Sequence, residues 1–182
     1  MKSLVLIFIL TLAGSGAWSQ DNAYLKFLST TRELTVGDSL RLDELSDGIR
    51  LDTSIVKQFF SPLLTSGNNK FKNRTYSSMG RISGNDNFYL FMVREDRRRA
   101  DSTGMMSAYL VTLKKTGDYI SSQKVGVTGT KKKSGYNIRS TLYKDNRIFI
   151  DSRIMTGEKL FEEIENYRIS KTGRFILEEN DK

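Results

Sequence analysis

Short strand-like segments alternate with turn residues from residue 79 to residue 177, and this alternation constrains the fold more than any other feature. Aromatic and β-branched residues fill the segments, while Gly, Asn, Asp, Lys and Thr separate them. The pattern predicts eight strands, over residues 79–83, 87–95, 106–115, 119–125, 136–143, 147–154, 162–170 and 174–177. We therefore expect a mainly β fold, an antiparallel meander of about eight strands that forms a sandwich or an open barrel.

The most apolar segments identify the centre of this meander. Residues 88–93 and 109–111 are apolar throughout, so they should lie centrally in the sheet. The residues that we expect in the core are Phe91, Leu110, Leu142, Ile148, Ile150 and Ile169.

A short N-terminal helix is predicted within residues 52–62. An Asp or Thr cap precedes its apolar residues, and Pro62 should end it near Phe60. The apolar residues recur at the spacing of one helical face, at Ile55, Val56, Phe59 and Phe60. We expect the two phenylalanines to pack against the sheet.

The stretch from residue 21 to about residue 51 is mixed and polar, with short apolar groups. Examples are Leu34-Thr35-Val36 and Leu40-Arg41-Leu42, which Gly37-Asp38 separates. The pattern is compatible with a small hairpin or with a loosely packed arm.

The first 19 residues have the three-part layout of a secretory signal peptide. Lys2 supplies the positive charge, residues 4–13 form an apolar run, and Ala17-Trp18-Ser19 is a small-x-small cleavage site. A membrane-spanning helix needs about 20 apolar residues, so we expect cleavage and a soluble protein in the periplasm or outside the cell. Residues 20–66 would then form the arm and short helix, in one domain with the meander over residues 67–182.

Two predicted hairpins share one outline. Residues 109–120 contain Lys115-Thr116-Gly117, and residues 167–176 contain Lys171-Thr172-Gly173 at the corresponding place. Over residues 79–177 these hairpins resemble blades of bacterial β-propellers, and the whole layout resembles small exported bacterial proteins of uncharacterised function. Because a propeller closes with about four to eight blades, two blades imply a continuous sheet, a sandwich or a partial barrel. The resemblance brings no catalytic residue with it.

The chain has neither histidine nor cysteine. Their absence excludes disulfides, Ser-His-Asp and Cys-His catalysis, and zinc sites built on those ligands. There is no phosphate-binding Gly-rich loop and no EF-hand spacing, so we expect no cofactor and no metal. Carboxylate chemistry remains open at Glu162, Glu163 and Glu165, either as the acids of a glycosidase or as a row of solvated surface charges.

The chain has a formal net charge of +8, and residues 67–182 hold 23 basic against 14 acidic residues. Consecutive turns of a meander fall alternately at its two ends, so the three longer connections, near Arg97, Lys131 and Gly157, should share one end. Seven basic residues would meet there: Arg97, Arg98, Arg99, Lys131, Lys132, Lys133 and Lys159.

This basic end predicts docking to an anionic polysaccharide, a lipid phosphate or an acidic protein face, with an affinity that falls as salt rises. Solubility alone is the other explanation of the charges. Nucleic acid is not expected as a partner, because aromatic residues do not interleave with the basic ones. The sequence thus favours an exported, non-catalytic binding or interaction module of unknown ligand. The alternatives are a small carboxylate-dependent, carbohydrate-active enzyme and a structural envelope protein.

Overall fold

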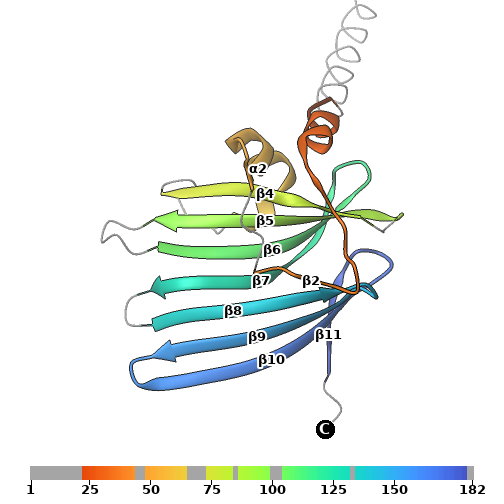
Figure 1. Ribbon diagram of the computed structural model, residues 1–182. Helices are drawn as coiled ribbons and strands as arrows, with labels where there is room; N and C mark the ends of the chain where they lie inside the picture. The colour runs from red at the N-terminus through yellow and green to blue at the C-terminus, as the bar shows by residue number, and fades with distance from the viewer. Residues whose placement is uncertain are drawn as a thin grey trace, which may run out of the picture.

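The computed structural model describes residues 22–43, 48–64, 73–83, 86–98, 104–131 and 134–179. In these residues eleven strands form a single, mostly antiparallel sheet, which confirms the mainly β fold (Figure 1). The strands are β1 (Glu33–Leu34), β2 (Ser39–Arg41), β3 (Ile49–Arg50), β4 (Arg74–Ile82), β5 (Phe88–Arg98), β6 (Gly104–Lys114), β7 (Tyr119–Lys131), β8 (Ser134–Tyr143), β9 (Arg147–Thr156), β10 (Lys159–Ile169) and β11 (Phe175–Glu178).

The strands from β4 to β11 pair in chain order, each antiparallel to the next, and they match the eight predicted strands. Three of the turns between them have one geometry. Gly117, Asn146 and Gly173 have φ angles of 95°, 65° and 83°. Each donates its backbone N–H to the carbonyl three residues earlier, at 2.9–3.0 Å. Gly and Asn adopt this left-handed conformation at low cost, which explains why the turns fall where the sequence predicts them.

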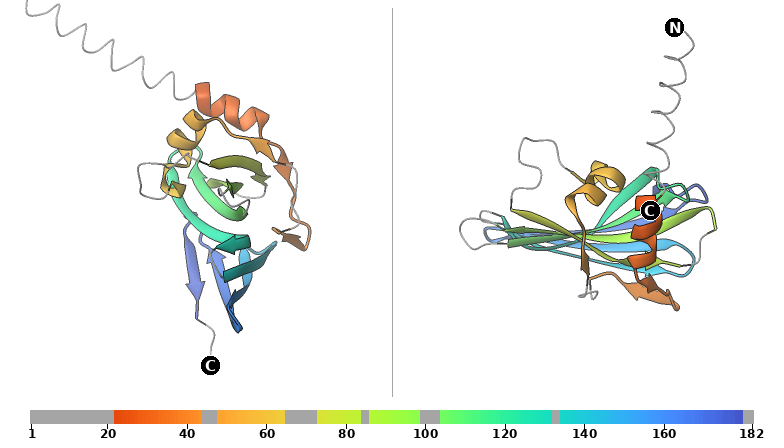
Figure 2. Two further views of the ribbon diagram at one scale, coloured as in Figure 1. Left: turned by 90° about the vertical axis from the view of Figure 1, so that its left-hand side faces the viewer. Right: turned by 90° about the horizontal axis from the view of Figure 1, so that it is seen from above.

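The N-terminal arm is part of the sheet, so of the two alternatives for this stretch the small hairpin is wrong. β1 pairs parallel to β4, with Leu34 opposite Ile82, whereas β2 pairs antiparallel to β8, with Leu40 opposite Leu142. β8 can accept β2 because β7 pairs with β8 only along residues 127–131. The arm therefore runs from one edge of the sheet to β8, across the open side of a partial barrel (Figure 2).

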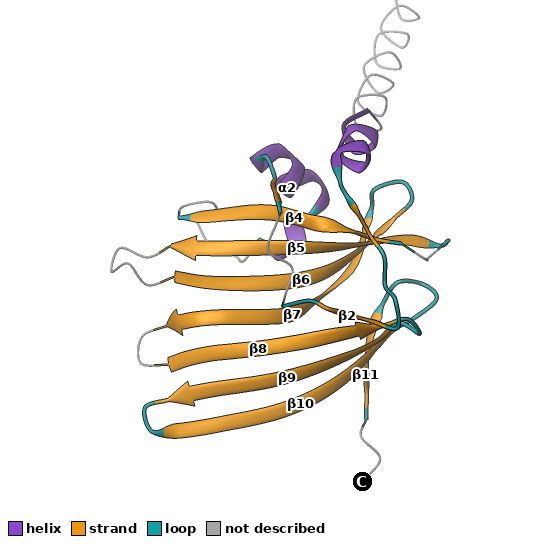
Figure 3. Ribbon diagram, in the orientation of Figure 1, coloured by secondary structure: helices purple, strands orange, loops and turns teal. Residues whose placement is uncertain are grey.

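Two helices lie at the β4 side of the sheet (Figure 3). The predicted helix is present as α2 (Thr53–Phe59), followed by the 3-10 turn η1 (Ser61–Leu63), and it ends before Phe60 as expected. Asp52 precedes α2 but makes no side-chain cap hydrogen bond. The other helix, over residues 22–30, was not predicted.

Both faces of β5 and β6 are covered, which explains their unbroken apolar runs. Leu90 and Leu110 face an inner cluster that fills the partial barrel. Phe91 and Val111 face an outer cluster under the helices, where the Phe27 ring lies 5.3 Å from the Phe91 ring. All six predicted core residues are buried: Phe91, Leu110, Leu142, Ile148, Ile150 and Ile169.

Candidate functional site

The antiparallel pairing brings the connections after β5, β7 and β9 to one end of the sheet, at the left of Figure 1. We call this the basic end. The expectation that these are the longer connections is wrong, because the strands extend further than predicted and leave only residues 132–133 between β7 and β8 and residues 157–158 between β9 and β10. Arg97 and Arg98 are the last two residues of β5, Lys131 is the last residue of β7, and Lys159 is the first residue of β10. Arg99, Lys132 and Lys133 lie outside the described residues.

An open cleft of about 880 Å³ lies at the basic end, and four arginines from three strands line it. Residues of β6 and β7 also line it. We call it the arginine cleft. Its lining residues are Arg50, Asn73, Arg74, Thr75, Arg94, Asp96, Arg97, Gly104, Met105, Met106, Thr128 and Gly129.

Strand register brings these arginines to one end of the sheet but divides them between its two faces. Arg50 of β3 lies opposite Ser77 of β4, and Ser77 lies opposite Arg94 of β5, so Arg50 and Arg94 share one face. Arg74 lies directly opposite Arg97, and both belong to the other face, because each is three residues from a member of the first set along its strand. Of the four, only Arg97 was a predicted site residue. Arg94 lies three residues before it in β5, whereas Arg50 and Arg74 come from other strands that no local pattern connects to it.

Two of the four arginines are paired with acids. Arg74 lies 3.1 Å from the Glu95 carboxylate, and Arg94 Nε lies 2.9 Å from Asp96. Glu95 is only 6% exposed and also accepts a 3.3 Å hydrogen bond from the Tyr109 hydroxyl. Burial, and then the charge of Glu95, raise the pKa of Tyr109 to about 12, so its hydroxyl stays protonated and keeps donating.

Arg50 and Arg97 make no ion pair with any residue in the described part of the chain. Like charges opposite each other on neighbouring strands, such as Arg74 and Arg97, destabilise a sheet. The cleft therefore concentrates positive charge that its own acids only partly neutralise. A bound anion would relieve that repulsion.

The three glutamates of β10 do not converge. Glu162 lies opposite Arg153, with 3.5 Å between the charged groups, whereas Glu163 and Glu165 lie on the other face of the strand. Glu165 accepts a 3.0 Å hydrogen bond from Tyr167, and Glu162 and Glu163 are exposed. Among the described residues, no group of three or more acidic side chains is placed to hold a metal ion.

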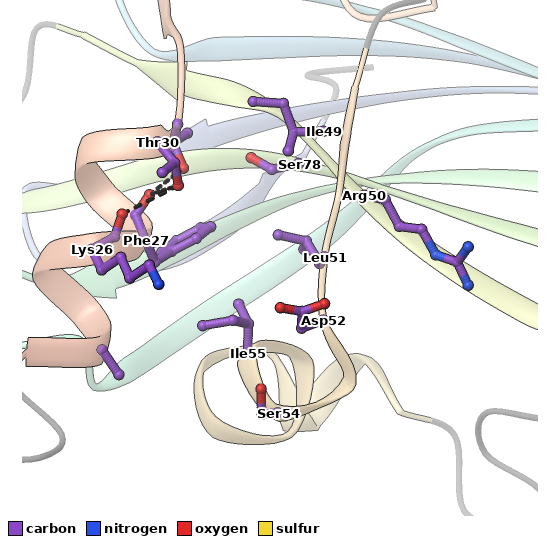
Figure 4. Close-up of a pocket in the computed structure, with 12 residues that line it drawn as sticks. Lys26, Phe27, Thr30, Ile49, Arg50, Leu51, Asp52, Ser54, Ile55 and Ser78 are labelled. Atoms are coloured by element: carbon purple, nitrogen blue, oxygen red, sulfur yellow. Dashed lines mark hydrogen bonds between the residues drawn. The ribbon is translucent and has the colours of Figure 1, made fainter.

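A second hollow, of about 380 Å³, lies between the helix over residues 22–30 and α2 (Figure 4). We call it the helix groove. Phe27, Leu51 and Ile55 line it, and Arg50 lines both this groove and the arginine cleft. Ser78 also lines the groove, and its buried Oγ has no hydrogen-bond partner within the described structure.

No protein-family model matches the chain, and no curated protein or solved structure matches it. In the described ranges, no helix is long and apolar enough to cross a membrane.

Proposed function

We propose that this protein is an exported, non-catalytic binding module that holds an anionic ligand in the arginine cleft. The observation that carries the proposal is an open cleft at the basic end that four arginines line, Arg50 and Arg94 on one face of the sheet and Arg74 and Arg97 on the other. Arg50 and Arg97 have no ion-pair partner in the described chain. Guanidinium groups bind carboxylates and phosphates in a planar, two-bond geometry, so these are the ligand groups that such a cleft suits.

An extended polyanion fits the cleft better than a single small ion. The cleft is open and long enough to border five strands, β3 to β7. Arg98 and Lys131 end the strands beside it, and Arg99, Lys132 and Lys133 follow them in the sequence. Lys159 does not line this cleft, and five strand spacings, about 24 Å measured along the sheet, separate β10 from β5.

The direct test is calorimetric titration of the purified protein with a short inorganic polyphosphate at low and at high salt. Arg50→Gln/Arg97→Gln should weaken binding at least about tenfold and flatten its salt dependence, because two unpaired charges are lost. Arg74 is unsuitable for this test, since its removal would leave Glu95 buried without its ion pair.

The matched control is Arg147→Gln/Arg168→Gln, which removes the same charge from two exposed arginines at the opposite end of the strands. It should leave the affinity within about twofold of the parent value. Equal losses in the two double variants would mean that only net charge attracts the polyanion, and the site assignment would be wrong.

The enzyme alternative has no comparable support. Its candidate acids, Glu162, Glu163 and Glu165, lie on two faces of one strand and line neither hollow. A glycosidase of the usual kind needs two carboxyl groups that flank one bond of the sugar.

A further inference from the structure

β10 has a free edge along half of its length. β11 pairs with β10 only at residues 166–169, whereas β9 pairs with β10 from Lys159 to Arg168. Among the described strands, none pairs with residues 159–165 on the side away from β9. This edge offers a row of backbone N–H and C=O groups to another strand.

Apolar side chains accompany this edge. Leu160, Phe161 and Ile164 of β10 are 52%, 56% and 55% exposed, and Met155 of β9 is 44% exposed. Leu160 lies directly opposite Met155 in the β9–β10 register, so the two exposed side chains are neighbours on one face. Such a surface on a sheet edge is typical of a site that another chain covers.

The edge lacks two of the devices that usually protect an edge strand. Residues 159–165 contain no proline, and their pairing with β9 runs without a register shift, so no bulge turns the edge away. The edge does carry charges, but they are of opposite sign at its two ends, with Lys159 at the start and acidic residues from Glu162 at the middle to Glu165 at the end.

We propose that a second copy of this chain pairs with the free edge, β10 against β10, antiparallel about a two-fold axis at Glu162. In this register Lys159 lies opposite Glu165 of the second copy, and Leu160 lies opposite Ile164 of the second copy. Both pairs occur twice, because a two-fold interface repeats every contact. Oppositely charged and apolar pairs across neighbouring strands stabilise a sheet.

The same register joins the exposed apolar residues. Met155 and Leu160 of one copy continue into Ile164 of the other, which gives a three-residue apolar row on each side of the axis. Chain pairing of this kind adds main-chain hydrogen bonds to these side-chain contacts.

Two contacts are unfavourable in this register: Glu162 meets its own counterpart at the axis, and Phe161 lies opposite Glu163 of the second copy. Each Glu162 already lies 3.5 Å from Arg153 on the same face, so each charge is partly neutralised by its own chain. The dimer follows from the edge of β10 alone and does not depend on anion binding at the arginine cleft.

Sedimentation velocity on the full chain over a range of concentrations tests the dimer. The parent protein should dimerise, and Lys159→Glu or Glu165→Lys alone should raise the dimer dissociation constant at least about tenfold, since each places like charges opposite each other. The double variant, with both changes, should return the constant to within about threefold of the parent value.

Recovery of dimerisation in the double variant would show that Lys159 of one copy contacts Glu165 of the other. Within one chain the two residues are six positions apart on one strand, about 20 Å, so they cannot pair with each other. Lys144→Glu, an exposed lysine at the opposite end of the sheet, is the control and should leave the dimer unchanged. A parent protein that stays monomeric at every concentration overturns the proposal. So does a double variant that dimerises no better than the single ones.

Discussion

Thr112 Oγ1 donates a 2.6 Å hydrogen bond to the carbonyl oxygen of Gly173, which lies 61 positions away in the sequence. Thr112 belongs to β6 and is fully buried, and Gly173 lies in the turn between β10 and β11. At the same turn, Asn87 Nδ2 donates to the carbonyl of Lys171 at 3.3 Å. These bonds hold the last hairpin against the start of the meander, so the sheet curls at this end while the basic end stays open (Figure 2).

Thr112→Val keeps the shape of the side chain and removes this bond. It should lower the free energy of unfolding by about 1–3 kcal/mol, because a buried carbonyl loses its side-chain donor. Urea denaturation measures the change. Thr130→Val, at an exposed position of β7, is the control and should change stability by less than about 0.5 kcal/mol.

Gly173 is restricted by its conformation and also by its neighbours. Its φ is 83°, and an added Cβ would lie 3.1 Å from Ile120 Cδ1 and 3.2 Å from the Phe88 ring. Gly157 has a φ of 61° but open space around it. Gly157→Ala should therefore lower the free energy of unfolding by only about 1–2 kcal/mol, the cost of a left-handed backbone conformation for a residue other than glycine. Gly173→Ala should lower it clearly more, because the added Cβ also meets its neighbours. Equal losses in urea denaturation would show that the turn does not pack as described.

The meander was predictable because its signals are local. Gly117 and Gly173 mark turns of one geometry, and the segments between turns carry the residues that strands prefer. The arm was not predictable in the same way. Leu34 and Leu40 find their partners in Ile82 and Leu142, far along the chain, and nothing in the local pattern specifies such pairing.

The missed helix had a weak signal of its own. Tyr24, Phe27 and Leu28 have helical spacing, but the segment is short, and the apolar Leu25 falls outside this face and is exposed. Tyr24 and Phe27 are buried because the outer face of the sheet accepts them. The candidate site was predictable in part. Chain order indicated which loops would meet, but Arg50 enters the cleft through β3, whose pairing with β4 no sequence pattern reveals.

The arm should contribute strongly to stability, since Leu42 is buried in the inner cluster and its backbone N–H donates to Ser140 at 3.0 Å. Leu42→Ala should lower the free energy of unfolding, measured by urea denaturation, by about 2–5 kcal/mol, as expected when a core leucine is truncated. Leu25→Ala removes the same atoms from an exposed position of the helix over residues 22–30 and should cost less than about 0.5 kcal/mol. A small effect at Leu42 would mean that the arm is only loosely attached.

The raised pKa of Tyr109 predicts a loss of stability at alkaline pH. Its pKa is raised to about 12 in the folded protein, whereas a tyrosine in the unfolded chain titrates near 10. The folded state holds the proton more tightly, so the stabilisation is complete below pH 10 and is lost as pH rises from 10 towards 12. Tyr109→Phe should reduce the fall in the free energy of unfolding over that range, while Tyr143→Phe, at an exposed position, should not.

The proposed function depends most on where an anion binds, and NMR spectroscopy of the ¹⁵N-labelled protein during titration with polyphosphate measures this directly. We predict that the largest shift changes fall on the backbone amides of Arg50, Arg74, Arg94 and Arg97, and that Arg147 and Arg168 at the other end stay nearly unchanged. Shift changes of similar size at both ends, or changes confined to the opposite end, would contradict an anion site in the arginine cleft.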